Sequence, residues 1–319
     1  MTKARGLADL GNAYSDGALS NRNMLINSDM RVAQRGTSLS APQGYTLDRW
    51  KSIRFGIGEY TVSQQAITDL TGFSKCARVQ RNSGTTSTNE AAFNQPVEQL
   101  NSARAAGQTV TLSFWLRVGA NYSGTAGSLK SGIAYTTSAT DVGMNYDNFT
   151  AGGTSSLVSR TGTTSWVYHT QSFAIPSTAK QVGVAFTTTA WSGTAGAADY
   201  YEITGVQLEA GDTATPFEHR GFGQELALCQ RYYYQDTTTD HFTRSFSCVS
   251  LGSFYEDYPL PTIMRATPTQ SVVLGTSVSK VNSVSAVGRT KKAGYLIFQK
   301  SATGDGFTSL NSFTADAEL

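Results

Sequence analysis

The chain has 319 residues, which is long enough for two domains of ordinary size. Only 15% of the residues are charged, and 25 basic against 23 acidic residues leave a net charge of +2. Neither sign forms a long run, so the electrostatic footprint that nucleic-acid binding needs is absent. The 31 glycines, 15 tyrosines and 15 phenylalanines are typical of a β-rich, turn-rich protein with an extracellular type of surface.

The cysteines and the hydropathy of the chain indicate the cellular compartment in which the protein is made. Cys76, Cys229 and Cys248 are widely spaced without a C-x-x-C motif, which indicates neither a disulfide framework nor a zinc site. The first 20 residues lack the apolar run of a signal peptide, and nowhere does a run of about 18 apolar residues occur. We expect reduced thiols, synthesis in a cytoplasm and no membrane insertion.

The N-terminal segment, residues 1–22, is small and polar and has no sustained period. It cannot bury enough apolar surface to fold alone, and such termini become ordered when another element holds them. We therefore predict an anchoring arm that docks on a partner or a neighbouring subunit. The contact residues would be Lys3, Arg5, Leu7 and Leu10.

Residues 23–212 form the first predicted domain, in which short β-like runs alternate with turn clusters. The runs 109–118 ("TVTLSFWLRV") and 180–188 ("KQVGVAFTT") alternate apolar and other residues, as a strand with one buried face does. The expected buried residues are Leu112, Phe114 and Leu116 in the first run and Val182, Val184 and Phe186 in the second. Trp115 falls on the opposite face. Residues 119–165 are rich in Gly, Ser, Thr and Asn and predict long loops between short strands.

The run 200–211 ("YYEITGVQLEAG") changes parity partway along. Tyr201 and Ile203 share one parity, whereas Val206 and Leu208 share the other. A bulge at Gly205 would direct all four side chains to one face.

Residues 213–235 predict a linker with a short helix, because Leu226, Cys229 and Tyr233 recur at helical spacing within 224–233. At two to three turns the helix needs packing to be stable. The segments "TRSFSCVSL", "LPTIMRATPT", "TQSVVLGTSVSKVNSV", "GYLIFQKS" and "SFTADAEL" follow as β-like runs. They predict a second, small β-sandwich over residues 236–319.

Glu218, His219 and Cys229 are residue types of a nucleophilic active site. Adjacent Glu218 and His219 would point to opposite faces of an extended segment, and Cys229 faces the apolar side of its helix, where a thiolate is disfavoured. We interpret Glu218, His219 and Arg220 instead as an interdomain hinge that pairs with carboxylates or carbonyls.

Other catalytic patterns are weak. Asp199, Glu202, Glu209, Glu256 and Asp257 could supply a carboxylate pair for glycoside hydrolysis, but acids this sparse are expected by chance. No Gly-rich phosphate loop, H-E-x-x-H or G-x-S-x-G motif occurs. We expect no enzymatic activity, no catalytic residues and no metal site.

Aromatic side chains are better functional candidates, because sugars bind to aromatic faces with polar groups around them. Trp115 lies on the face opposite the expected core, and Trp191 lies in the loop-like "TTTAWSGTAG". The candidate glycan-binding residues are Trp115, Trp191, Tyr135 and Tyr146. Packing between strands or subunits is the alternative role for Trp115.

Three stretches carry a family resemblance: "NRNMLINSDMRVAQRGTS", the downstream "GYTLDRW", and "YEITGVQLEAGDTATPFEHRGFGQELALCQRYYYQ". With the opening "MTKARGLADL", they resemble tail-fibre-like and virion-surface structural proteins of tailed bacteriophages, particularly marine and cyanobacterial ones. The resemblance covers about residues 1–50 and 200–235.

The resemblance implies an all-β architecture: a carbohydrate-binding-module-like jelly-roll sandwich, opened by "NMLINSDM" and closed by "YEITGVQLEAG", then the short helix and the second sandwich. Such modules often hold a structural calcium. Asp29 fits that role loosely, and "ITGVQLE" lacks the expected acid pair, so we expect no cofactor.

The resemblance implies that the protein is a structural protein of the virion. The first interpretation is a tail fibre or tail-fibre adaptor, whose arm docks on other virion proteins and whose sandwiches face outward. A capsid-surface fibre or decoration protein is the second interpretation. A module that binds host-surface polysaccharide is the third, and a polysaccharide depolymerase the fourth. A homotrimer is expected by analogy with the family alone.

Overall fold

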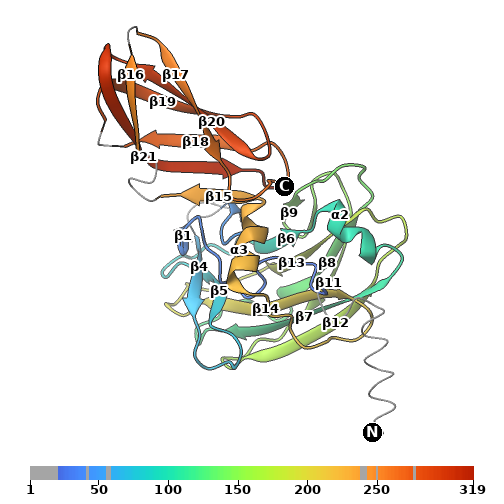
Figure 1. Cartoon of the computed structure of the whole chain (residues 1–319). Helices are drawn as coiled ribbons and strands as arrows, with labels where there is room; N and C mark the ends of the chain where they lie inside the picture. The colour runs from blue at the N-terminus through green and yellow to red at the C-terminus, as the bar shows by residue number, and fades with distance from the viewer. Residues whose placement is uncertain (1–20, 41–42, 55–58, 238–242, 249–250, 276–277) are drawn as a thin grey trace. The chain divides into compact units, whose positions relative to one another are not determined.

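The computed structural model describes residues 21–40, 43–54, 59–237, 243–248, 251–275 and 278–319 (Figure 1). The chain divides into two compact units. The first ends at Gly221, and the second spans Phe222–Glu318. Residues 213–221 of the predicted linker therefore belong to the first unit, and its helix begins the second.

The first unit holds two antiparallel sheets, which lie one above the other in Figure 1. In spatial order the first sheet contains β1 (Ser38–Ser40), β4 (Tyr60–Ala66), β5 (Lys75–Arg81), β14 (Tyr200–Ala210), β7 (Thr109–Val118) and β12 (Val167–Ala174). The second contains β11 (Thr154–Ser159), β8 (Leu129–Thr136), β13 (Gln181–Thr188), β6 (Ala91–Pro96), β3 (Lys51–Arg54) and β2 (Gly44–Tyr45). The shorter elements are β9 (Met144–Asn145), β10 (Asn148–Phe149), α2 (Gln99–Ser102) and the 3-10 turn η1 (Ala103–Ala105).

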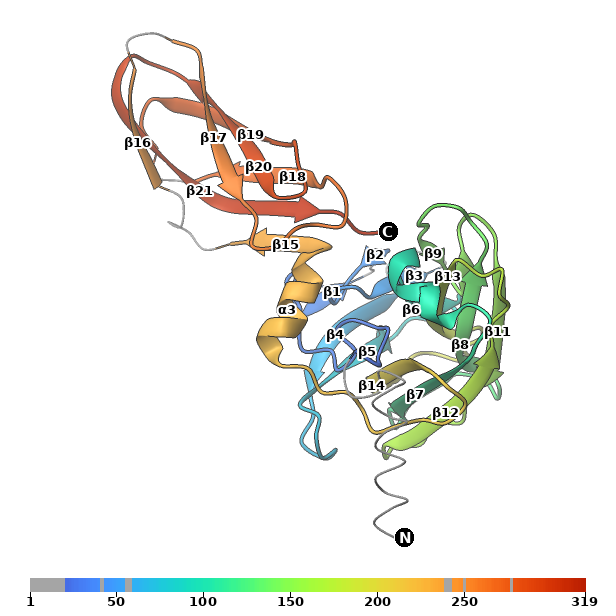
Figure 2. The ribbon, with the colours of Figure 1, turned by 45° about the vertical axis from the view of Figure 1, so that its right-hand side comes forward.

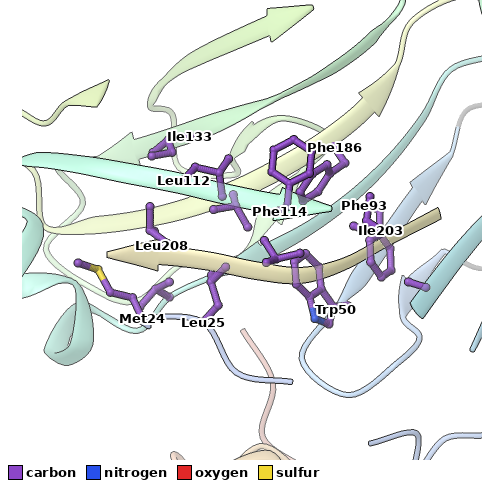
Figure 3. Close-up of a cluster of buried hydrophobic side chains, with 14 of the residues drawn as sticks. Met24, Leu25, Trp50, Phe93, Leu112, Phe114, Ile133, Phe186, Ile203 and Leu208 are labelled. Atoms are coloured by element: carbon purple, nitrogen blue, oxygen red, sulfur yellow. The ribbon is translucent and has the colours of Figure 1, made fainter. Parts of the chain in front are cut away.

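The facing sides of these sheets form the core of a jelly-roll sandwich. Trp50 is fully buried and stacks on Phe93 with ring centroids 4.9 Å apart, and Phe114 meets Phe186 edge to face at the same separation. Figure 3 shows these rings beside the aliphatic side chains that complete the core. Each such ring pair adds about 0.5–1.5 kcal/mol beyond the area that it buries.

The alternation read from the sequence is confirmed in both central strands. Leu112, Phe114 and Leu116 of β7 are at most 1% exposed, and so are Val182, Val184 and Phe186 of β13. All eight residues of β13 are buried, however. Met144 and Phe149 of β9 and β10 pack with Ala185 on its second face, so this sheet is covered on both sides.

The bulge expected at Gly205 is also confirmed. The pairing of β14 with β7 shifts register between Thr204 and Gln207, and Gly205 has φ +59°. As a result Ile203 and Val206 are both fully buried on the core side despite their opposite parity.

The segment "NMLINSDM", which was expected to open the sandwich, is not a strand. Residues 23–36 are irregular chain, buried over 23–30 and mostly half-buried over 31–36, and the first strand begins at Ser38. Asn27 and Met30 have left-handed φ values of 53° and 59°, which break an extended strand. The Asn27 side chain donates to the carbonyls of Val32 and Asp48, replacing ladder bonds.

The second unit begins with α3 (Phe222–Gln230). The helix ends three residues before the expected end at residue 233, because Tyr233 already starts a strand. One sheet contains β15 (Tyr233–Asp236), β16 (Thr243–Cys248), β18 (Thr269–Leu274) and β21 (Gly304–Asp316), and the other β17 (Ser253–Pro259), β19 (Val281–Gly288) and β20 (Ala293–Lys300) (Figure 2). Phe298 and Phe313 lie in the shared core, so this unit is a second small β-sandwich.

Two details of the second unit differ from expectation. Residues 260–268 form no strand, because Pro261 and Pro268 lack the N–H that a ladder requires. Ser253–Pro259 forms β17, which was not predicted. Among the described residues no helix is long and apolar enough to cross a membrane.

Candidate functional site

A groove of about 540 Å³ lies on the outer face of the first sheet of the first unit. Its lining comes from three parts of the chain: the sheet itself, the loop before β5, and the segment after β14. The lining residues are Phe73, Ser113, Trp115, Tyr168, Gly205, Ala214, Thr215, Pro216, Phe217 and His219. A concave site of aromatic side chains with a few polar groups is the usual form of a small-ligand site.

Two outward-facing aromatic residues dominate the groove. Trp115 of β7 is paired directly with Tyr168 of β12, and their ring centroids lie 5.2 Å apart with planes tilted by 49°. Tyr168 is 43% exposed, one of the larger exposures among the apolar residues of this unit. Trp115 is half-buried, and together the two rings form a contiguous apolar surface, which marks an interaction site more often than a single exposed apolar side chain does.

The bulge in β14 shapes the floor beside this pair. A Cβ placed on Gly205 would come within 2.6 Å of the Phe73 ring and 3.3 Å of Trp115 Cδ1. Only glycine combines this close approach with a positive φ. Phe73 in turn packs edge to face on Phe217 and lies against His219, so the bulge allows three rings to close one side of the groove.

The wall of residues 214–219 has no regular secondary structure, and buried polar residues of β14 hold it. The Glu209 carboxylate accepts from Thr215 N at 2.9 Å and Thr215 Oγ1 at 2.5 Å. Gln207 Oε1 accepts from Glu218 N at 2.8 Å. Both Gln207 and Glu209 are at most 2% exposed, so these bonds are shielded from water.

Two of the three predicted hinge residues, Glu218 and Arg220, bond to the chain at residues 21–25, whereas His219 lies in the wall against the Phe73 and Phe217 rings. Glu218 accepts from the backbone N–H groups of Asn21 and Asn23 at 2.6 and 2.7 Å. Arg220 donates to the carbonyls of Asn23 and Leu25 at 2.5 and 2.8 Å. They thereby attach the wall of the groove to the beginning of the first unit; their role as a hinge between the units stays a prediction.

Paired charges lie beside the groove on the same face. The fully buried Glu202 carboxylate accepts from Arg78 at 2.7 Å and from Arg117, whose Nη1 also reaches Asp69 at 2.7 Å. Trp166 Nε1 donates to Asp69 at 3.1 Å and lowers the pKa of that carboxyl. Each charge here has an opposite partner.

The structure separates the four predicted glycan-binding residues. Trp115 lines the groove, whereas Tyr135 lines a second cavity of about 250 Å³ between β8, β11 and β12. Tyr146 lies between β9 and β10, where its backbone carbonyl accepts from Asn94. Trp191 is only 3% exposed, which contradicts the loop exposure expected of it, because the Tyr60 and Tyr122 rings pack against it.

Sequence reasoning missed Tyr168, Phe73 and Phe217. The alternation of Trp166 and Tyr168 in "SWVYHTQSFA" could have indicated a strand. The pairing of Tyr168 with Trp115, however, depends on which strands become neighbours in the folded chain. The predicted anchoring residues Lys3, Arg5, Leu7 and Leu10 lie outside the described residues.

Three of the five carboxylates considered for catalysis have structural partners. Asp199 bonds to Arg81, Glu202 to two arginines and Glu209 to Thr215. Cys229 is 1% exposed. Burial raises the pKa of the Cys76 thiol to about 12. The lack of enzymatic activity stays a prediction.

Arg81 occupies a group of oxygen atoms of the kind that could otherwise bind calcium. This fully buried guanidinium donates to the carbonyls of Ser87 and Gly193 at 3.0 and 2.8 Å and to Asp199 Oδ2 at 3.2 Å. Carbonyl and carboxylate oxygens are also calcium ligands, and here a side-chain cation takes them. The described residues contain no cluster of three or more metal-ligating side chains, and Asp29 pairs with Arg31.

No protein-family model and no curated protein matches the chain. Among solved structures it is similar to the enzymatically active domain of tailspike protein 4 of bacteriophage CBA120, with 14% identity over 60% of this chain and a TM-score of 0.39; the match spans 22% of that chain. It is similar to TmCBM61 in complex with β-1,4-galactotriose, with 15% identity, 60% and 100% coverage and a TM-score of 0.33. A third is a putative sugar binding protein from Bacteroides thetaiotaomicron, with 12% identity, 59% and 100% coverage and a TM-score of 0.36.

Proposed function

We propose that the chain is a surface subunit of a tailed-phage particle, a tail fibre or tail-fibre adaptor, whose first sandwich binds a glycan of the host surface. The signature "QLEAG…TPFEHR…EL…CQRYY" supports the virion assignment. The observation that carries the binding assignment is the Trp115 and Tyr168 pair in a groove on the outer sheet face.

The chemistry of the groove suits a sugar. The C–H groups on one face of a pyranose ring form an apolar surface that packs on an aromatic ring, while the hydroxyl groups at its edge need polar partners. The exposed His219 supplies an imidazole beside the rings, whereas Ser113 is only 2% exposed and the Thr215 hydroxyl already donates to Glu209. A few polar groups among aromatic ones set the orientation of a ligand in such a site.

Binding is tested with the purified full chain on a glycan array and on polysaccharides extracted from host cells. Trp115→Ala and Tyr168→Ala should each weaken binding about tenfold, equivalent to about 1.4 kcal/mol. Tyr255→Ala removes another exposed tyrosine, 55% exposed and outside the groove lining, and should leave binding unchanged. Binding that survives both groove substitutions would exclude this groove.

The virion assignment is tested separately by particle incorporation. A variant lacking residues 2–20 should fold and remain soluble but fail to join particles, because the arm is the proposed anchor. Incorporation at the level of the full chain would refute the anchor. Incubation of the full chain with the bound polysaccharide should release no reducing ends, since the proposed function is binding alone.

A further inference from the structure

We propose that the groove selects uncharged glycans over acidic ones; this rests on the proposed function and names its ligand class. The first observation concerns the lining itself. None of the ten lining residues is Lys, Arg, Asp or Glu. Apart from His219, no lining side chain can carry a positive charge, so a carboxylate placed against these rings would lose hydration without gaining a permanent cation, which is costly in an apolar site.

The nearest cations along the sheet are held by a buried anion. Arg117 lies two residues from Trp115 on the same strand, and its guanidinium is shared between Glu202 and Asp69. Arg78 binds the same Glu202 carboxylate, which has no exposed side-chain surface. Drawing either arginine toward a ligand would leave Glu202 buried with one cation fewer, and breaking a buried pair is strongly unfavourable.

The cations beside the wall of the groove are engaged as well. Arg22 donates to the Pro216 carbonyl at 3.0 Å, and Arg220 donates to two backbone carbonyls. Arg31 pairs with Asp29 and donates to the Arg220 carbonyl at 2.7 Å. These groups shape the wall and are not directed at a ligand.

The local charges also cancel. The arginines and carboxylates already described around the groove number five of each. A balanced surface gives no long-range attraction for a polyanion. Binding through this groove should therefore depend on stacking and neutral hydrogen bonds.

The test compares polysaccharides that differ only in charge. Polygalacturonate, alginate and acidic host extracts are each used before and after chemical reduction of their carboxyl groups to alcohols, beside galactan, xylan, mannan and glucan. We expect neutral members to bind at least tenfold more tightly than acidic ones at pH 8. We also expect affinity to be unchanged between 20 and 500 mM salt, since screening affects charge-based binding.

A charge introduced into the lining gives an independent measurement. Ala214→Lys places an ammonium group at the wall and should raise affinity for the acidic members several-fold, while the uncharged Ala214→Gln should not. No gain of acidic binding with Ala214→Lys would count against the argument that missing cations set the selectivity.

The outcomes separate the two proposals. Tighter binding of the acidic members, abolished by Trp115→Ala, would overturn the selectivity and leave glycan binding in place. Binding of no member of the panel would overturn the proposed function itself. Salt-independent binding of neutral members that Trp115→Ala weakens would support both.

Discussion

Replacing Gly205 by alanine tests how the bulge in β14 builds the groove. The residue has φ +59°, and the added methyl group would lie 2.6 and 2.7 Å from two carbons of the Phe73 ring. An L-residue in the left-handed region costs about 1–2 kcal/mol. The Phe73 ring must also move, which weakens its contacts with Phe217 and His219, each ring pair contributing about 0.5–1.5 kcal/mol.

We therefore expect Gly205→Ala to lower the free energy of unfolding by about 2–4 kcal/mol. Glycan affinity should fall with it, because Phe73 is part of the lining. Gly193→Ala is the matched control, since Gly193 has the same φ of +59° but no atom within 4 Å of its added Cβ. The control should cost only the backbone part of this, about 1–2 kcal/mol.

Urea unfolding of both variants, each also made in a Phe73→Ala background, separates the two contributions. In that background the excess cost of Gly205→Ala over Gly193→Ala should shrink, because the ring that clashes most is gone and only the 3.3 Å contact with Trp115 Cδ1 remains. Equal costs for the two glycine variants in the wild-type background would refute the steric argument. An excess as large without Phe73 as with it would also refute it.

Three further predictions concern stability. Arg81→Met should lower the free energy of unfolding by about 3–5 kcal/mol in urea titrations, since it leaves Asp199 buried without its cation; a loss below 1 kcal/mol would contradict this. Burial, and then the nearby Arg160, lower the pKa of His169 below 6.5, so the unfolded chain takes up this proton at higher pH than the folded one. Stability should fall as the pH drops from about 7 through the ordinary histidine range, and His169→Gln should flatten that part of the urea midpoint profile. We propose that no structural calcium is present, so melting temperatures in EDTA and in calcium should agree; a higher value in calcium would contradict this.

The sequence alone correctly predicts a chain rich in β-strands, and it predicts which side chains of a given strand face the core. Side chains alternate with period two in any strand, so Phe114 and Phe186 could be assigned to a core before their partners were known. The parity change at Gly205 predicts the bulge for the same reason. Both inferences use residues that lie within a few positions of one another.

Long-range packing decides the rest. Trp115 and Tyr168 meet across a strand pair, and Phe73 reaches Phe217 from a distant loop, so no local pattern could indicate that they share a groove. Trp191 sits in a loop-like sequence but is buried by two tyrosine rings from elsewhere in the chain. The sequence determines which side chains leave each strand on which face; only the pairing of strands and the path of loops over the sheet decide which of those side chains meet.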